Sequence, residues 1–470
     1  MVWGSKTIGV CIRKYWERFL NLEGRLRNMI NSIRVEERDL TIGIVGLGYV
    51  GLPTALGFHD AGFSIVGLDI SERVINLLKE GKNPGDDPAF DDAIPNDERW
   101  MVTLDAKEAI PLCDVIIVTV PTPVLDDHRP DLRYVESAGE VTFENIDKNK
   151  KPIVVLESTV YPGVTREVWG PILEKKELTE GIDLYLAYCP ERFVPGDPEH
   201  GVRQVPRVVG ANDPEVCSTL ADLYSTLTSG EVFPVSSIEV AEAAKVVENV
   251  QRDLNIALVN ELALIFPEIG LDVEEVLTAA ATKWNFHRYS PGIGVGGHCI
   301  PVDPYYLIQK ARAAGAPVDL ITSARTVNAN MPNQVATKVL HHAAKLGKTP
   351  RSLKILLLGW SYKPGISDVR ETPSEPLAKS LIDSGCNVFV WDPFIQEEDF
   401  SDAPGTWVES PFNADADVVV LCTAHKEVIE IDWKKLLNSS ELGLFYDGRR
   451  VMDLENLRSI GWTVTGVGYP

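Results

Sequence analysis

Long apolar runs and paired cysteines are both missing from this sequence of 470 residues. No stretch approaches the ~18 apolar residues that span a bilayer, and the N-terminus lacks the apolar core and small-residue cleavage site of a signal peptide. The seven cysteines are widely spaced and contain no CxxC pair, which favours cytosolic thiols over a disulfide framework. We therefore expect a cytoplasmic protein without a membrane span.

Positive charge is also scarce. The chain has 45 Lys and Arg against 68 Asp and Glu, a net charge of -23, which opposes binding to nucleic acids and anionic membranes. Hydrophobic residues make up 44% and charged residues 24%, as in folded globular proteins. At ~150 residues per domain, the length predicts about three domains. We expect no nucleic-acid partner, whereas a locally cationic pocket for a small anion remains compatible with this composition.

The first 38 residues differ from the rest, because they hold eight Lys and Arg against four Glu. Apolar residues at helical spacing, among them Phe19, Leu26 and Ile30, are compatible with a membrane-surface helix. A solvated helical extension, or a start codon placed too early, explains the segment more simply. We assign residues 1–38 no function.

Strand and helix patterns alternate from Leu40 onward. An apolar strand at 41–48 ends in glycines, a helix is expected through 55–61, and a second strand and helix follow at 63–69 and 72–78. This alternation predicts a doubly wound parallel sheet. We place this first domain at residues 39–236.

The middle of the chain is predicted to be helical. Residues 238–266 contain no glycine or proline, which predicts one long helix that bridges domains or pairs with a second subunit. We expect a central helical domain at 237–346 and a homodimer. Residues 347–470 repeat the strand pattern of the first domain without its glycine motif. The expected fold is α/β, with two Rossmann-like doubly wound parallel-sheet domains joined by a central long helix and helical region.

A GLGYVG motif at residues 46–51 follows the first predicted strand and opens a helix. Its glycines permit a tight turn, close approach of a pyrophosphate and close helix packing. Asp69 ends the next strand, where a carboxylate accepts hydrogen bonds from an adenosine ribose and repels a 2'-phosphate. The pattern favours NAD over NADP, against the simpler interpretation of packing glycines with a surface aspartate. Arg73 either lies over the adenine or faces solvent.

A second glycine-rich stretch ends in a thiol. Residues 292–297 contain four glycines, which suggests a backbone pressed against a ligand. Cys299 follows, beside exposed N–H groups that stabilise a nucleophilic thiolate, whereas Cys113 and Cys422 lie in apolar runs and are expected in the core. Asp303 comes four residues after Cys299, on the same side of a helical turn. This spacing suits a general base for water.

Lys245 lies among apolar residues of the long predicted helix. Its ammonium is expected to be partly withdrawn from water, and Asn249, four residues later, shares its helical face. Such a pair stabilises a developing alkoxide. A lysine that merely extends into solvent fits the helical pattern too.

The chain resembles the UDP-glucose/GDP-mannose dehydrogenase family over residues 40–470, because eight motifs occur in the same order as in that family. The motifs are GLGYVG (46–51), VPTP (120–123), ESTVYPG (157–163), PER (190–192), AKVVEN (244–249), GGHCIPVDP (296–304), SYKPGISDVRETP (361–373) and FYDGRR (445–450). The resemblance implies an NAD-dependent oxidoreductase of polysaccharide biosynthesis. It oxidises the C6 alcohol of a nucleotide sugar to a carboxylate with two NAD, without releasing the aldehyde and without a metal.

The resemblance also implies roles for individual residues. Cys299 forms a thiohemiacetal and then a thioester that water hydrolyses, while Lys245 and Asn249 stabilise oxyanions. The catalytic residues it implies are Cys299, Lys245, Asn249, Asp303, Thr159 and Glu191, of which the last three position or activate water. The predicted cofactor-binding residues are Gly46, Gly48, Tyr49, Val50, Gly51, Asp69, Arg73, Thr122 and Arg370. The predicted substrate-binding residues are Lys363, Arg449, Gly296 and Gly297.

The segment after Glu191 distinguishes branches of the family. UDP-glucose enzymes often continue as PEFLxEG, whereas in this chain Pro195 replaces the second acid. The chain thus resembles the branch acting on UDP-N-acetyl-D-mannosamine, which we favour, or UDP-N-acetyl-D-glucosamine. An arginine that relatives often supply from the other subunit falls on Lys283, with His287 or Arg288 as substitutes.

Other functions also fit parts of the sequence. They are a UDP-glucose or GDP-mannose 6-dehydrogenase, a two-electron hydroxy-acid dehydrogenase that needs no thiol, and a nucleotide-sugar sensor without turnover. The sensor would show damage to the Cys/Lys/Asp set, and none is visible in the sequence.

Overall fold

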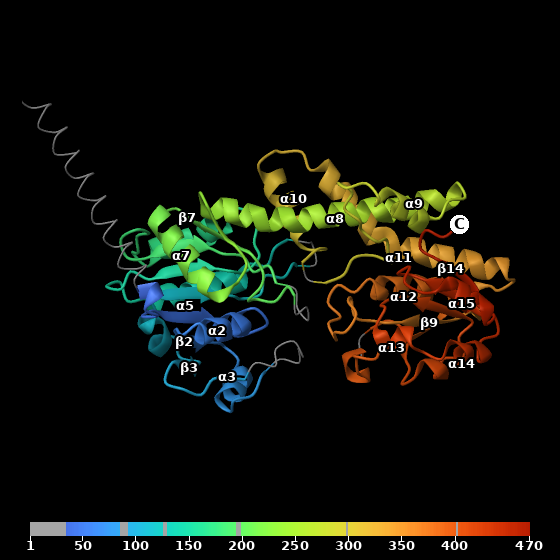
Figure 1. Cartoon of the computed structure of the whole chain (residues 1–470), viewed down its shortest axis with the longest axis horizontal. Helices are drawn as coiled ribbons and strands as arrows, with labels where there is room; N and C mark the ends of the chain where they lie inside the picture. The colour runs from blue at the N-terminus through green and yellow to red at the C-terminus, as the bar shows by residue number, and fades with distance from the viewer. Residues whose placement is uncertain (1–33, 85–92, 126–128, 194–198, 298, 401–402) are drawn as a thin grey trace, which may run out of the picture. The chain divides into compact units, whose positions relative to one another are not determined.

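The computed structural model describes residues 34–84, 93–125, 129–193, 199–297, 299–400 and 403–470. The chain divides into two compact units, residues 1–246 and 247–470, which are described separately (Figure 1). The predictions for Pro195 and for the first 33 residues lie outside the described part. Within that part, no helix combines the length and apolar character needed to cross a membrane.

Unit 1 is built on an eight-stranded sheet with the order β3-β2-β1-β4-β5-β6-β7-β8. Its strands are β1 (Thr41–Val45), β2 (Ser64–Leu68), β3 (Trp100–Thr103), β4 (Val115–Val118), β5 (Ile153–Leu156), β6 (Tyr185–Tyr188), β7 (Arg207–Ala211) and β8 (Val232–Val235). All neighbours are parallel except β6 and β7. The doubly wound sheet is therefore confirmed, with one antiparallel pair that the sequence pattern did not reveal.

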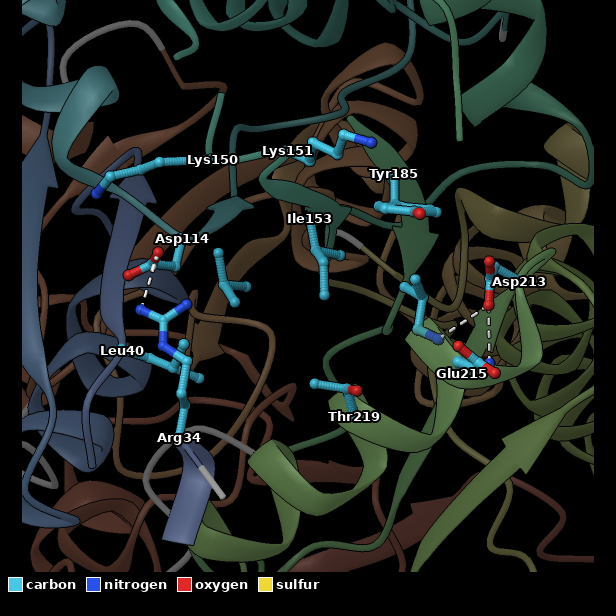
Figure 2. Close-up of a pocket in the computed structure, with 12 residues that line it drawn as sticks. Arg34, Leu40, Asp114, Lys150, Lys151, Ile153, Tyr185, Asp213, Glu215 and Thr219 are labelled. Carbon is cyan, nitrogen blue, oxygen red and sulfur yellow. Dashed lines mark hydrogen bonds and ion pairs between the residues drawn. The ribbon is translucent and has the colours of Figure 1, made fainter. Parts of the chain in front are cut away.

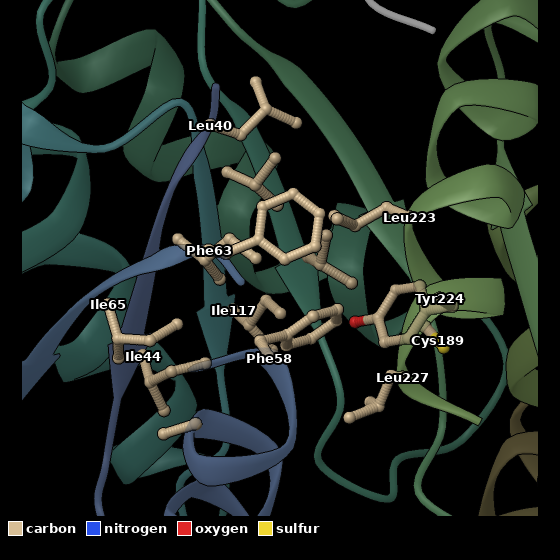
Figure 3. Close-up of a cluster of buried hydrophobic side chains, with 14 of the residues drawn as sticks. Leu40, Ile44, Phe58, Phe63, Ile65, Ile117, Cys189, Leu223, Tyr224 and Leu227 are labelled. Carbon is tan, nitrogen blue, oxygen red and sulfur yellow. The ribbon is translucent and has the colours of Figure 1, made fainter. Parts of the chain in front are cut away.

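Helices cover both faces of this sheet. They are α2 (Gly51–Asp60), α3 (Glu72–Lys79), α4 (Ala106–Ala109), α5 (Arg133–Asn145), α6 (Val164–Lys175) and α7 (Pro214–Leu227). Buried side chains of α2, α3 and α7 form one core with the sheet, and those of α4, α5 and α6 form the other. In the first core, Phe58 meets Phe63 and Tyr224 edge to face, with ring centroids 6.0 and 5.6 Å apart (Figure 3).

The long helix predicted from residue 238 is α8 (Ile238–Glu268). It is labelled in Figure 1, and the boundary between the units falls within it. The helix ends before Gly270, whose left-handed φ of 74° lets the N–H of Leu271 reach back to the carbonyl of Phe266. The expected single long helix is thus confirmed at both ends to within two residues.

Unit 2 continues from α8 into a smaller sheet whose six strands are all parallel. The strands are β9 (Lys354–Leu358), β10 (Asn387–Trp391), β11 (Thr406–Trp407), β12 (Val418–Leu421), β13 (Leu444–Asp447) and β14 (Thr463–Gly466), in the order β11-β10-β9-β12-β13-β14. The second Rossmann-like sheet is confirmed. It shares the reversal of order beside its first strand, β9, with the sheet of unit 1.

The helices of unit 2 also form two layers. They are α9 (Val273–Ala280), α10 (Asp303–Ala313), α11 (Asp319–Lys345), α12 (Ser374–Asp383), α13 (Lys426–Ile429), α14 (Trp433–Asn438) and α15 (Leu454–Ser459). One core joins α8, α9, α11 and α12 to the sheet, and the other joins α13, α14 and α15. Short 3-10 helices cover Ile110–Leu112 in unit 1 and Pro350–Ser352, Glu397–Phe400 and Pro411–Asn413 in unit 2.

Candidate active site

The loop between β1 and α2 needs its three glycines for three different reasons. Gly46 has a left-handed φ of 95°. A Cβ on Gly51 would lie 1.8 Å from the carbonyl oxygen of Gly46 and 2.4 Å from Oγ1 of Thr119. At Gly48 a Cβ would meet nothing within 4 Å. The first and third glycines therefore shape the loop, and the second leaves open the space that a dinucleotide pyrophosphate requires.

Asp69, at the end of β2, ties its strand to this loop. Its Oδ2 accepts the N–H of Leu47 at 2.7 Å and its Oδ1 accepts the N–H of Ser71 at 2.8 Å. A carboxylate oxygen can accept more than one hydrogen bond, so the ribose interaction predicted for Asp69 is compatible with this geometry. Arg73 is exposed and donates to the carbonyl of Pro84 at 3.4 Å.

Tyr49, within the glycine loop, is 40% exposed and stacks on Phe193 with ring centroids 5.9 Å apart. Phe193 follows the PER motif, whose Glu191 comes after β6. Val50, predicted beside Tyr49 at the cofactor, precedes the first residue of α2 and is half-buried. The structure thus connects the glycine loop with the segment that carries Glu191.

The loops after β4 and β5 also meet at this edge of the sheet. Oγ1 of Thr122 donates to the carbonyl of Thr159 at 2.7 Å, and Oγ of Ser158 donates to the carbonyl of Val120 at 2.6 Å. Because β1, β2, β4, β5 and β6 are parallel, their carboxyl ends share one edge. The predicted residues of unit 1, from the glycine loop to Glu191, therefore lie along the carboxyl edge of the sheet, on both sides of the point where the strand order reverses between β1 and β4.

A pocket in unit 1 lies at the opposite edge of the sheet. Leu40, Asp114, Ile153 and Tyr185, at or just before the starts of four strands, contribute to its lining (Figure 2). Arg34 reaches Asp114 there in an ion pair of 3.1 Å. Dinucleotides bind at the carboxyl ends of parallel strands, so this pocket is not the cofactor site.

Lys245 lies on α8 and is 8% exposed. Its burial agrees with the expectation that the ammonium is withdrawn from water. Asn249, one helical turn later on α8, is half-buried and belongs to unit 2.

Cys299 and Asp303 form the turn that leads into α10. The carbonyl of Cys299 accepts the N–H groups of Val302 and Asp303 at 3.1 and 2.8 Å. The carboxylate of Asp303, 2% exposed, accepts a short hydrogen bond from Nδ2 of Asn249. Two predicted catalytic residues, 54 positions apart in the sequence, are therefore in direct contact.

Among the described cysteines, Cys299 alone is not fully buried. The others are Cys113, Cys189, Cys217, Cys386 and Cys422, and burial raises the pKa of each of their thiols. Cys113 and Cys422 are thus core residues, as predicted. The accessible thiol is the one that follows the glycine-rich stretch.

The glycines before Cys299 approach a loop of their own unit. A Cβ on Gly296 would lie 2.7 Å from Cβ of Tyr362, and one on Gly297 would lie 2.9 Å from its ring. The N–H of Gly297 donates to the carbonyl of Arg370 at 3.1 Å. Side chains at Gly296 and Gly297 would therefore clash with protein atoms of the 361–373 motif. Contact of these glycines with the substrate stays a prediction.

Of the predicted cations of unit 2, Arg449 lies beside this stretch, and Arg370 and Lys363 belong to the 361–373 motif that contacts it. A Cβ on Gly292 would lie 3.0 Å from Nη1 of Arg449, and burial lowers the pKa of Arg449. Arg370 forms a two-point ion pair with Asp368, its Nη2 lying 2.6 Å from Oδ2. Lys363 directly follows Tyr362, and its carbonyl accepts a hydrogen bond from Oγ of Ser361 at 3.1 Å.

A buried histidine and aspartate that sequence reasoning missed hold the loop of Lys363. Oδ2 of Asp392 accepts the N–H groups of Trp360 and Ser361 at 2.6 and 2.9 Å and lies 3.1 Å from Nε2 of His425. Nδ1 of His425 accepts the N–H of Gly365 at 3.1 Å. These hydrogen bonds hold the pKa of Asp392 below its usual value although burial acts to raise it. Asp392 directly follows β10, as Asp69 directly follows β2. This shared position after the second strand of each sheet was the sequence feature that could have identified Asp392.

Metal ligands were not expected, and the described residues contain no group of three or more His, Cys, Asp or Glu side chains that could hold a metal ion. Unit 1 offers a buried ammonium and carboxylates, and unit 2 offers a thiol, a carboxylate and cations. These groups suit nucleophilic and acid–base chemistry on a phosphorylated ligand.

Three family models match successive parts of the chain. They are the NAD binding domain (residues 40–228), the central domain (239–330) and the UDP binding domain (356–454) of the UDP-glucose/GDP-mannose dehydrogenase family.

Curated and solved relatives match over most of their length. The chain is 39% identical to a UDP-N-acetyl-D-glucosamine 6-dehydrogenase of Pseudomonas aeruginosa, covering 83% of this chain and 92% of the relative. It is 32% identical to a UDP-N-acetyl-D-mannosamine dehydrogenase of Pyrococcus horikoshii, covering 91% and 99%. The structure of a UDP-D-ManNAc dehydrogenase from Pyrococcus horikoshii superimposes with a TM-score of 0.81 at 31% identity, covering 91% of this chain and 99% of that one.

Proposed function

The chain belongs to the UDP-glucose/GDP-mannose dehydrogenase family, and we propose that it oxidises the C6 alcohol of a UDP-N-acetylhexosamine to a carboxylate. The observation that carries the proposal is the accessible thiol of Cys299 on a turn shared with Asp303, which is hydrogen-bonded to Asn249. NAD is the cofactor and a UDP-sugar the substrate class. The sequence favours UDP-N-acetyl-D-mannosamine, and the relative of higher identity supports UDP-N-acetyl-D-glucosamine as the next candidate.

Residues of unit 1 fit NAD. The open space beside Gly48 accommodates a pyrophosphate, and Asp69 at the end of β2 is at the position that binds an adenosine ribose. NAD, when bound, accepts a hydride from the substrate. The chain's contribution is to hold the dinucleotide at the carboxyl edge of the sheet, beside the loops of Thr122 and Thr159.

Cys299 provides the nucleophile in the proposed mechanism. The C6 alcohol first loses a hydride and a proton to become an aldehyde. The thiolate then adds to the aldehyde carbon, forming a C–S bond and a thiohemiacetal that gains one proton. Loss of a second hydride and that proton leaves a thioester, and water cleaves the C–S bond to give the acid and regenerate the thiolate. Each sugar thus yields two NADH.

Proton transfer and oxyanion stabilisation are assigned to polar residues of both units. Lys245, buried on α8, and Asn249 are suited to stabilise the alkoxide of the first step and the tetrahedral oxyanions. Asp303, which accepts a hydrogen bond from Asn249, and Glu191 and Thr159 of unit 1 are the residues suited to position or activate water. Lys363 and Arg449 supply positive charge for the diphosphate, which lets an acidic protein bind an anionic substrate.

The decisive experiment counts NADH per sugar. Purified protein and NAD are incubated with UDP-N-acetyl-D-mannosamine, UDP-N-acetyl-D-glucosamine, UDP-glucose and GDP-mannose, and NADH and acid product are measured. We expect two NADH and one acid per UDP-N-acetylhexosamine. One NADH per molecule would indicate a two-electron dehydrogenase, and reaction with UDP-glucose alone would contradict the branch assignment.

We further propose that the protein is a homodimer that pairs through α8. Val247, Leu258 and Ile265 are 55%, 53% and 46% exposed and lie 11 and 7 residues apart. At 3.6 residues per turn these intervals return to one face of the helix. An exposed apolar stripe of this kind is suited to pack on its own copy about a twofold axis.

Charge on the stripe is expected to separate the subunits. The double variant Val247→Glu and Leu258→Glu should change the mass measured by light scattering from near twice 51.8 kDa to near 51.8 kDa. Leu320→Glu is the matched control, because Leu320 is 71% exposed on α11 and lies outside the stripe. A double variant that keeps the larger mass, or a wild-type protein of 51.8 kDa, would contradict the proposal.

A further inference from the structure

A buried charged cluster lies behind Glu191 in unit 1. Arg207 is 0% exposed, and its Nη2 lies 2.5 Å from Oε2 of Glu191. Its Nη1 lies 3.6 Å from Oε1 of Glu157, which is 1% exposed. A guanidinium this deeply buried requires a carboxylate partner, because a buried unpaired charge is strongly destabilising.

The antiparallel strand β7 explains how Arg207 reaches this place. β7 pairs with β6 in opposite direction, with Tyr188 opposite Gly210. The first residue of β7 therefore lies beyond the carboxyl end of β6, at the same edge as Glu157 and Glu191. The antiparallel direction of β7 thus places Arg207 at the carboxyl edge of the sheet, beside Glu157 and Glu191.

The two carboxyl groups on this guanidinium have different surroundings. Oε1 of Glu191 also accepts the N–H groups of Arg192 and Phe193, at 2.6 and 2.7 Å. Glu157 accepts a hydrogen bond of 2.6 Å from the hydroxyl of Tyr224, while its Oε2, like Oε2 of Glu191, has no hydrogen-bond partner among the described residues. What distinguishes Glu191 is its two backbone N–H donors and the shorter distance to the guanidinium, 2.5 Å against 3.6 Å for Glu157, which orient its carboxylate more firmly.

Glu157 is also the member of the cluster that changes charge near neutral pH. Burial raises its pKa to about 7, with Glu191 adding to the shift and Arg207 and the hydroxyl of Tyr224 opposing it. The other titratable groups facing it are Tyr224 on α7 and Cys189 after β6, both labelled in Figure 3, and burial raises the pKa of each well above its usual range. Only Glu157 is thus expected to gain charge as the pH rises through 7.

We propose that Arg207 is a positioning residue for thioester hydrolysis, and that the charge of Glu157 modulates proton transfer at Glu191 through their shared guanidinium. This inference rests on the proposed function. In that step Glu191 takes a proton from water as the new C–O bond forms and the C–S bond to Cys299 breaks, leaving the acid and a thiolate. When Glu157 ionises, a second negative charge faces the guanidinium, and this charge favours movement of the proton from water towards Glu191.

Arg207→Lys tests the positioning role, because lysine keeps the charge and loses the fork that reaches two carboxyl groups. We expect both hydride transfers to continue, seen as a first burst of two NADH per subunit. Steady-state acid formation should fall at least about tenfold. The acyl-enzyme should then accumulate, visible by intact-protein mass spectrometry as a sugar adduct on Cys299.

Two further variants separate the possible outcomes. Glu191→Gln should accumulate the same adduct, with acid formation about 10²-fold slower. Arg203→Gln is the matched control, since Arg203 is 38% exposed and pairs with Asp60, and it should not accumulate the adduct. If E191Q accumulates adduct and R207K does not, the role of Arg207 is overturned and the proposed function stands. If neither variant forms an adduct and the wild type yields one NADH per sugar, the proposed function itself fails.

Glu157→Gln tests the role of the Glu157 charge. Because glutamine has nearly the same shape as glutamate, this variant also provides a test if the R207K protein does not fold. The rate of acyl-enzyme breakdown in the wild type should rise through an inflection near pH 7, as Glu157 ionises. The E157Q variant should lack this inflection while keeping its hydride transfers and melting temperature. An unchanged pH profile in E157Q would overturn the role of the Glu157 charge.

Discussion

Cys299→Ser is expected to lower acid formation by at least about 10³-fold, a larger loss than that expected for Arg207→Lys or Glu191→Gln. A serine hydroxyl is a far weaker nucleophile than a thiolate at neutral pH, because almost none of it is ionised. Without the covalent adduct, the aldehyde is not held for the second oxidation. The yield should therefore fall from two NADH per sugar towards one, measured by absorbance together with product analysis.

A second cysteine provides the matched control. Cys386 is 6% exposed in the core of unit 2, and Cys386→Ser introduces the same chemical change away from the proposed site. Its activity should remain near the wild-type rate, with a lower melting temperature because a hydroxyl replaces a buried thiol. Full acid formation by C299S would reject the covalent mechanism and favour a two-electron dehydrogenase.

Gly51→Ala is expected to damage both the fold and cofactor binding. The added Cβ would lie 1.8 Å from the carbonyl oxygen of Gly46, which no rotation of a side chain can relieve because the obstacle is backbone. The start of α2 must move away from the loop after β1. Overpacking of this kind costs about 1–3 kcal/mol of stability, and displacement of the loop should weaken NAD binding about 10- to 100-fold.

Gly48→Ala separates the two effects. A Cβ there meets no protein atom within 4 Å, and the residue has no positive φ. Its melting temperature without NAD should equal that of the wild type, while the methyl group occupies space predicted for the pyrophosphate and weakens binding. Thermal unfolding and NAD titration of both variants make the comparison. A G51A protein with wild-type melting temperature and affinity would contradict the proposed loop geometry.

Patterns among neighbouring residues predicted the long helix, the glycine loop and the turn that carries the thiol. The helix from residue 238 was recognisable because each helical hydrogen bond joins residues only four positions apart, and a run without glycine or proline does not interrupt these bonds. The loop after β1 was recognisable for a similar reason, since the roles of Gly46 and Gly51 arise within six positions. The turn between Cys299 and Asp303 also depends on neighbours in sequence.

Ion pairs and hydrogen bonds between residues far apart in the sequence could not be predicted in this way. Nothing near Arg207 in the sequence indicates a partner at Glu191, and nothing near Asp392 indicates His425. Both pairs exist because the order and direction of the strands place particular strand ends side by side. The apolar pattern of β7 does not indicate that this strand runs antiparallel to β6.

By itself, then, the sequence determined the succession of strands and helices, the dinucleotide loop, the candidate thiol and the family, because each is encoded in residues close together along the chain. Only the tertiary structure decided which buried charges neutralise one another and which loops hold Glu191 and Lys363. Such pairings depend on the packing of whole sheets, since a buried charge is stable only where a distant element brings its partner within a few ångströms.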